Sequence, residues 1–312
     1  MAGSSAKPKR SISLPTRLHP NSQKIEAQLN KLKTNWEYSS FSSRETPLGS
    51  ENIQSGLSDL AELYNSTKEL IHSPLTQQAL LQHHSRQMVE ETLDMSIGLL
   101  DACGATRDLL LRMKERVHTL QSALRRKAMG DSSIEIDVQS YINFRKNAKK
   151  EVSKSLRALK TMQISNVQAF HALDVVDHPL KMVTTLLREL SAIAVSIFRS
   201  LFVFLSVPAA TMSKASSGWS LLSKLFVPTS FAALEREHKI FNEVGSVDIS
   251  LWSLQGQLRK NNINNGAQID VGLVKRRLKS LDCCIEGLEA GLDYFFRCLI
   301  QHRVFLLNLL TP

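Results

Sequence analysis

The sequence predicts an all-α fold: an elongated bundle of long antiparallel helices with a disordered basic tail at its N-terminus. The chain has 312 residues, of which only 13 are glycine and 9 are proline, so it is poor in the residues that turns between strands require. Apolar residues recur at helical spacing along most of the chain, and no strand-like alternation lasts more than a few positions. A hydrophobic fraction of 43% is sufficient for the core of one large domain.

The N-terminal part divides into a tail and two helices. Residues 1–20 are polar, basic and interrupted by three prolines, so we expect them to be disordered. Residues 21–312 are expected to form a single helical domain. Its first helix begins at Asn21-Ser22, which are good N-cap residues, and carries apolar residues at helical spacing as far as Trp36. A loop over residues 39–52 separates it from a second helix that begins near Ile53.

The middle of the chain predicts two long helical stretches. Pro74 either ends the second helix or occupies the first turn of the next. The helical pattern then runs from 75 to 129, with a kink or short break at Cys103-Gly104. A further helix is expected from about Asp137 to Val176, before Pro179.

The second half begins with a strongly apolar stretch, residues 180–207. Prolines and a glycine then predict an internal loop over residues 208–230, which contains a short apolar cluster around Trp219. Residues 231–258 read as another helix, and the asparagine-rich run 261–266 reads as a loop.

The last forty residues carry the clearest pattern, an apolar repeat with alternating steps of four and three. Such a 3.5-residue repeat is typical of a coiled-coil-like packing seam. His302 is the one polar position within it, and Phe296, Val304, Phe305, Leu307 and Leu310 are expected to widen the buried stripe. The packing seam consists of Val274, Leu278, Leu281, Ile285, Leu288, Leu292, Phe295, Leu299, Leu306 and Leu309.

Residues 190–210 are about as long and as apolar as a membrane span. Arg199 near their centre and several serines offset the gain from insertion. On a helical wheel, Arg188, Arg199 and Ser206 fall on one narrow stripe, with Ser191 and Ser196 beside it. This pattern favours a packed core helix with one wet edge, and membrane insertion remains the alternative.

A basic amphipathic helix is predicted over residues 141–160, which carry seven positive charges and one negative. Its apolar residues share one face, from Tyr141 to Leu159, and its cations spread over the other. Such a face is either simply solvated or binds an acidic protein, an anionic membrane surface or nucleic acid. Nucleic acid is the least favoured of these, because no aromatic residue interleaves the cations. The candidate contact face is Lys146, Lys149, Lys150, Lys154, Arg157 and Lys160.

The tail contains a candidate regulatory motif formed by Arg10, Ser11, Ser13 and Pro15. Arg10 lies three residues before Ser13, as a basophilic kinase requires, and Pro15 lies two residues after it. The pattern matches the phosphoserine motif that 14-3-3 proteins bind. We therefore expect phosphorylation of Ser13 and, after it, 14-3-3 as a candidate partner. The basic run 7–10 is also a weak nuclear address.

The sequence contains no familiar catalytic motif, neither a P-loop nor a dinucleotide-binding glycine run, a zinc-protease helix or a nucleophile elbow. His171, Asp174 and His178 share a helical face, but the two histidines are about 10 Å apart along the axis, too far to share an ion. We expect no enzyme activity, no metal and no cofactor.

The net charge of +10 predicts attraction to acidic partners. The four cysteines have no disulfide-framework spacing, and the N-terminus has no secretory leader, so we expect a cytoplasmic protein. Association with a membrane is a second prediction for its location, and a nuclear location is less favoured. The sequence leaves the oligomeric state open.

Three stretches together, residues 11–20, 100–110 and 287–308, resemble a land-plant family of helical proteins. This family is known as domain of unknown function 241 and is grouped with the BYPASS-related proteins. The basic helix 141–160 matches it too, so the resemblance covers nearly the whole chain in order. It implies a role in root and shoot development, and it implies no activity, cofactor or active-site residue. The sequence thus predicts a non-enzymatic plant protein that acts through protein contacts.

Overall fold

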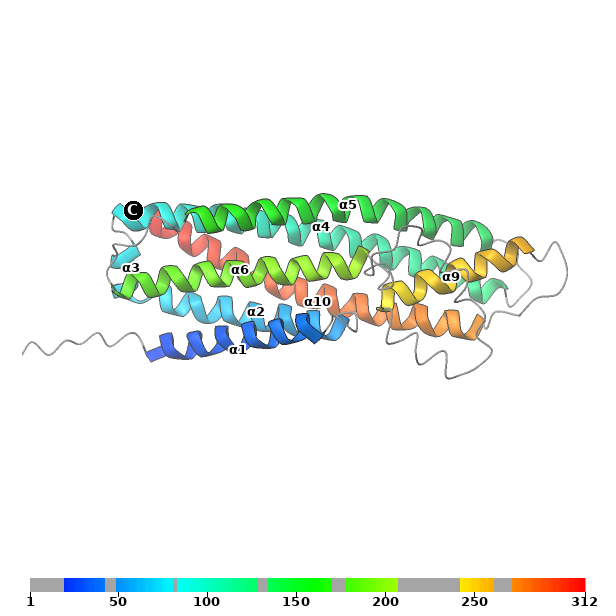
Figure 1. Cartoon of the computed structure of the whole chain (residues 1–312), viewed down its shortest axis with the longest axis horizontal. Helices are drawn as coiled ribbons and strands as arrows, with labels where there is room; N and C mark the ends of the chain where they lie inside the picture. Colours follow the sequence, from blue (N-terminus) through cyan, green and yellow to red (C-terminus); the bar gives the residue numbers. More distant parts are fainter. Residues whose placement is uncertain are drawn as a thin grey trace, which may run out of the picture.

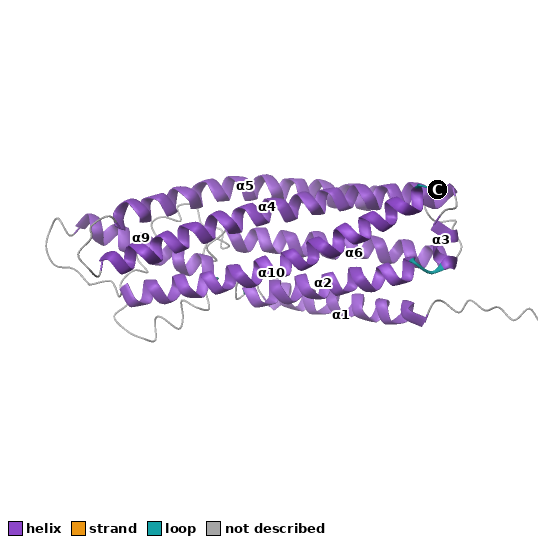
Figure 2. Cartoon of the chain, turned by 180° about the vertical axis from the view of Figure 1, so that it is seen from behind, coloured by secondary structure: helices purple, strands orange, loops and turns teal. Residues whose placement is uncertain are grey.

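The computed structural model describes residues 20–42, 49–80, 83–127, 134–169, 178–206, 242–260 and 271–311. These residues form eight α-helices and no strand, and the long helices lie side by side along one axis (Figures 1 and 2). The predicted all-α elongated bundle is therefore confirmed. The helices are α1 (Pro20–Ser42), α2 (Ser50–Ile71), α3 (Pro74–Leu80), α4 (His83–Lys127), α5 (Ile134–Ala169), α6 (His178–Ser206), α9 (Glu243–Lys260) and α10 (Val271–Leu310).

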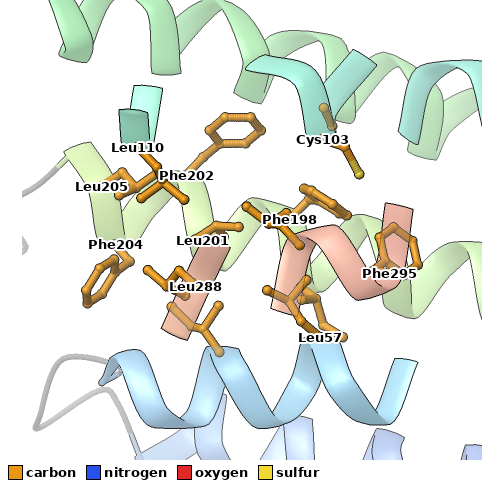
Figure 3. Close-up of a cluster of buried hydrophobic side chains, with 14 of the residues drawn as sticks. Leu57, Cys103, Leu110, Phe198, Leu201, Phe202, Phe204, Leu205, Leu288 and Phe295 are labelled. Carbon is orange, nitrogen blue, oxygen red and sulfur yellow. The ribbon is translucent and has the colours of Figure 1, made fainter. Parts of the chain in front are cut away.

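Helix α6 lies at the centre of the bundle. It packs against α1, α2, α3, α4 and α5, while α10 packs against α2, α4 and α9. Helices α4 and α5 are antiparallel neighbours, and α9 covers the end of the bundle that lies opposite α3 (Figure 1). Segments distant in sequence therefore share one core, to which Leu57 of α2, Cys103 of α4, Phe198 of α6 and Phe295 of α10 all contribute (Figure 3).

The structure buries nine of the ten residues of the packing seam, and it leaves Leu309 half-buried. His302 is buried as well, at 2% exposure. The expected widening of the stripe is right for Phe296, Phe305 and Leu310, which pack partly against the core. It is wrong for Val304 and Leu307, which are 49% and 40% exposed, because among the described helices none covers this side of α10.

Helices α10 and α2 approach each other closely where α10 carries two glycines. A Cβ atom added at Gly291 would lie 3.3 Å from Cβ of Leu57, and one added at Gly287 would overlap the side chain of Gln54. Small residues four apart therefore let the two helix backbones come together on this side.

The apolar helix α6 is part of the protein core. By length and composition Val183–Ser206 is the one described segment that could cross a membrane, yet 67% of its most apolar window is buried in the bundle. Arg188 and Arg199 are exposed, as expected for the wet edge, and Ser196 accepts a hydrogen bond of 3.0 Å from the indole N–H of Trp36. Ser206 was expected on this edge but is 5% exposed, because the start of α9 packs against the end of α6, where Asn242 donates to the carbonyl of Phe204.

Several predicted boundaries shift. Cys103-Gly104 makes no break, because α4 continues through it for 45 residues and Cys103 is fully buried. Helix α1 extends through Ser42 into the expected loop, and α5 runs from Ile134 to Ala169 rather than from 137 to 176. Pro74 occupies the first turn of α3, and the described part of the helix expected over 231–258 is α9. The tail up to residue 19 and the predicted loop over 208–230 lie outside the described residues.

Candidate functional site

The candidate tail motif, Arg10, Ser11, Ser13 and Pro15, lies outside the described residues, and so do His171 and Asp174. Their roles stay predictions from sequence. Within the described part of the chain, no group of three or more His, Cys, Asp or Glu side chains is arranged to hold a metal ion.

The cations of the candidate contact face lie on the outside of α5. Lys146, Lys150, Lys154, Arg157 and Lys160 are exposed, whereas Tyr141, Ala148, Val152 and Leu159 on the opposite side of the helix are buried. Lys149 differs from the other lysines because it is half-buried. Burial lowers the pKa of its ammonium group, and the neighbouring Arg145 adds to the effect against the attraction of Asp248.

A buried polar cluster, which the sequence analysis missed, joins α5, α6 and α9. The guanidinium of Arg145 donates from Nε and Nη2 to the carboxylate of Asp248, at 2.9–3.1 Å, and from Nη1 to the carbonyl of Leu205, at 2.6 Å. The hydroxyl of Tyr141 donates to the same carboxylate at 2.9 Å. Arg145 and Asp248 are 3% and 1% exposed, so the charges of this ion pair are isolated from solvent.

The electrostatics of this cluster keep the guanidinium of Arg145 charged. Burial works against the charged guanidinium, but the Asp248 carboxylate outweighs it and raises the pKa of Arg145. Burial and the same carboxylate raise the pKa of Tyr141, so its hydroxyl stays a donor. Because every polar group here is bonded within the protein, the cluster stabilises the packing of α5, α6 and α9 against one another.

Two sequence signals could have located this cluster. Arg145 lies four residues after Tyr141, so it falls on the apolar face of α5 and not among the exposed cations. Asp248 is the only charged residue in the run 244–251, which is otherwise apolar or small. Buried charges are almost always paired, so a charge on a buried face predicts a partner on another helix.

His302 is the second buried polar group of note. Both ring nitrogens are buried without a hydrogen-bond partner, and the ring of Tyr64 stands edge-on with its centroid 5.1 Å away. Nearby hydroxyls of Thr92, Ser96 and Ser191 already donate to carbonyl groups of their own helices. Burial lowers the pKa of His302 to about 4, so the ring is neutral at physiological pH.

A shallow groove runs between α4 and α5. It is lined by Arg112, Arg116, Asn143 and Asn147, among others, and the ion pair between Arg112 and Glu151 crosses it. The Arg112 hydrogen bond holds the pKa of the Glu151 carboxyl below its usual range. Both arginines of the groove are thus bonded within the protein, since Arg116 donates to the hydroxyl of Ser140.

An exposed apolar patch lies where α4 and α10 meet. Ile97, Ile300, Val304 and Leu307 are 37–49% exposed. The guanidinium of Arg303 bonds to the carbonyl of Leu93 and the hydroxyl of Ser96, at 2.5 and 2.7 Å, which brings these parts of the two helices together. We call these four residues the α4–α10 apolar patch.

No curated protein and no solved structure matches the chain. The family model described as Protein BPS1 matches residues 56–309. This match begins within α2 and ends one residue before the end of α10, and it includes the buried cluster, the basic helix α5 and the packing seam of α10. The chain belongs to the BPS1 family, a BYPASS-related family of plant proteins.

Proposed function

We propose that this protein is a non-enzymatic, cytoplasmic helical scaffold that acts in root and shoot development by binding other proteins. Membership of the BPS1 family supports a developmental role in plants. The observation that carries the proposed mechanism is the α4–α10 apolar patch, since apolar side chains that stay exposed together often mark a protein contact.

The chemistry around the patch favours one kind of partner. Asp94 and Asp101 of α4 are exposed on either side of Ile97. An amphipathic helix with apolar residues along one face and lysines or arginines beside them would match the patch and these two aspartates. The occupant we propose is therefore a basic amphipathic helix of another protein.

The proposal is tested by placing two carboxylates on the patch in the full-length protein. We expect the variant Val304→Asp/Leu307→Asp to lose its bound partners in pull-downs from plant tissue and to fail to restore root and shoot growth in plants that lack the protein. The matched control is Leu111→Asp/Ile136→Asp, which changes two other exposed apolar residues. Normal growth with the patch variant, at wild-type protein level, would contradict the proposal.

Phosphorylated Ser13 provides a second protein contact in this proposal. A phosphoserine three residues after Arg10 and two before Pro15 has the chemistry that 14-3-3 proteins bind. We expect the Ser13→Ala variant to lose 14-3-3 from a pull-down while it keeps the partners of the apolar patch. Retention of 14-3-3 by Ser13→Ala would remove the motif from the proposal.

The alternative function is a membrane-associated protein anchored by residues 190–210. The apolar length of Val183–Ser206 supports it, and the burial of this helix between α1, α2, α4 and α5 weighs against it. An inserted helix would keep the protein in membranes after an alkaline wash, whereas a scaffold with α6 in its core would be released.

A further inference from the structure

The candidate basic face of α5 continues onto α6. Arg199 of α6 is exposed, and its helix packs against α5. Figure 1 shows the two helices side by side over most of their length. We name the combined surface the α5–α6 basic surface, and it consists of Lys146, Lys150, Lys154, Arg157, Lys160 and Arg199.

The register of the two helices gives the level of Arg199 along α5. Arg145 of α5 bonds to the carbonyl of Leu205, and the helices run antiparallel, so Arg199, six residues before Leu205, lies about level with residue 151. The other side of α6 faces α1, where Ser196 bonds to Trp36 and Glu189 to Lys33. Arg199, which is exposed, therefore lies at about the level of residues 150–154 of α5, on a side of α6 that does not face α1.

The carboxylates on these two helices are bonded to helices on either side. Glu151 is the only acidic residue of α5 between 143 and 164, and it pairs with Arg112 of α4. Glu189 is the only acidic residue of α6 between 183 and 206, and it pairs with Lys33 of α1. Among the described residues, the six cations of the surface have no carboxylate within ion-pair distance. By contrast, Lys114 of α4 pairs with Glu289 of α10 on the other side of the bundle.

The composition of the surface favours lipid over protein. Four of its six cations are lysines, and no aromatic side chain in the described part of α5 or α6 is exposed. Energetically important contacts between proteins are enriched in tyrosine, tryptophan and arginine, and interfaces are depleted in lysine. Binding to an anionic bilayer requires neither a central aromatic side chain nor a pocket, because the diffuse surface potential of the bilayer attracts clustered lysines. The cations from Lys146 to Lys160 extend for about 21 Å along one helix, as a flat contact requires.

We propose that the α5–α6 basic surface binds the anionic headgroup surface of a phospholipid bilayer, so that the bundle lies along the membrane with α6 still in its core. This contact goes beyond the protein binding proposed above and uses residues other than those of the α4–α10 apolar patch; α6 lies in front in Figure 1 and α10 lies in front in Figure 2. It also differs from insertion of α6, because it leaves Phe198 and Phe202 buried in the protein.

The test is sedimentation of the purified full-length protein with vesicles. One set contains phosphatidylcholine alone, and in the other about a third of the lipid is phosphatidylserine. We expect binding to the second set only, with release when the salt is raised from about 0.1 M to 0.5 M. The variant Lys150→Glu/Lys154→Glu/Arg199→Glu should bind roughly 100-fold more weakly.

The matched control is Arg125→Glu/Lys279→Glu/Arg297→Glu, which changes the net charge equally at exposed positions on α4 and α10. We expect it to bind like the wild type. Equal losses in the two variants would overturn the proposal, because binding would then follow net charge alone. Binding that survives high salt and an alkaline wash would overturn it in favour of inserted α6. Binding to a poly-glutamate peptide without any preference for phosphatidylserine would reassign the surface to an acidic protein.

Discussion

The carboxylate of Asp248 on α9 accepts hydrogen bonds from two side chains of α5, Tyr141 and Arg145, and Arg145 also bonds to α6. Removal of this carboxylate tests the buried polar cluster. In Asp248→Asn the guanidinium of Arg145 would stay buried without a counter-charge. Breaking one partner of a buried pair typically costs about 3–5 kcal/mol. We expect the free energy of unfolding, measured with urea at neutral pH, to fall by this amount.

The control for this prediction replaces both members of the pair. Arg145→Met/Asp248→Leu removes both charges and fills the space with apolar atoms, so we expect it to be more stable than Asp248→Asn. Tyr141→Phe removes one hydrogen bond to the carboxylate and should cost about 1.5–3 kcal/mol. A fall in the free energy of unfolding of less than about 1 kcal/mol in Asp248→Asn would contradict the stabilising role of the buried polar cluster.

His302 predicts a specific dependence of stability on pH. Its pKa is about 4 in the fold because of burial, against about 6.5 in an unfolded chain. Between these values the unfolded chain binds a proton that the folded chain does not. The stability contributed by the neutral ring is therefore complete above pH 6.5 and is lost as the pH falls toward 4, by about 3 kcal/mol.

The variant His302→Leu isolates this effect. It cannot take up a proton, and it leaves no ring nitrogens without partners beside Tyr64. We expect it to be at least as stable as the wild type at pH 7 and to lose the steep decline between pH 6.5 and 4, as measured by urea unfolding at each pH. The same decline in both proteins would mean that other groups cause it.

At the scale of residues, the sequence predicted which side chains are buried better than which ones bond. Periodicity placed Leu278 and Phe295 in the seam, because burial follows from the angle around a helix. The partner of Arg145 lies 103 positions away in the chain, and no helical period carries that information. Half-burial of Lys149 was missed for a related reason, since it depends on how closely a neighbouring helix approaches.

At the scale of elements, Gly104 tests whether α4 is a continuous rod. A Cβ atom added there meets nothing within 4 Å, and glycine inside a helix costs about 0.5–1 kcal/mol relative to alanine. We expect Gly104→Ala to raise the free energy of unfolding by that amount. A break or kink at Cys103-Gly104 would instead make the substitution destabilising.

Gly56 of α2 provides the opposite control. A Cβ atom added at Gly56 would lie 2.7 Å from the ring of Trp36, which is 5% exposed and fixed by its bond to Ser196. We expect Gly56→Ala to destabilise the protein by about 1–3 kcal/mol. Both substitutions replace glycine with alanine, so a difference in the sign of the stability change would arise from how closely each glycine is packed.

The elements themselves were largely predictable, whereas their ends were not. Helix α6 was recognised as a core helix with a wet edge because Arg188 and Arg199 fall on one stripe. The expected break at Gly104 is wrong, since the low helix propensity of one glycine is a small effect beside the packing of Cys103 and Leu110 around it. The expected burial of Val304 and Leu307 is wrong, because a wide apolar stripe does not reveal where the neighbouring helices end.

At the scale of the whole molecule, the sequence predicted a bundle but not the neighbours within it. The seam of α10 indicates that one side of this helix is buried, and leaves open by which helices. The close approach of α10 to α2 depends on Gly291 and Leu57 together, which lie more than two hundred residues apart. Contacts of this kind also decide whether the helices from α1 to α10 unfold as one unit.

The expectation of a single helical domain is tested by two tryptophans in different parts of the bundle. Trp36 lies on α1 against α6, and Trp252 lies on α9 at the end of the bundle (Figure 1). In one variant Trp219 and Trp252 become phenylalanine, and in the other Trp36 and Trp219 do. If α6 and α10 join both ends into one core, fluorescence and circular dichroism should follow the same urea transition within each variant. Comparison within a variant removes the effect of the substitutions on stability.

A fluorescence transition for Trp252 that precedes the loss of helix, with coincident transitions for Trp36, would show that α9 and its neighbours form a separate folding unit.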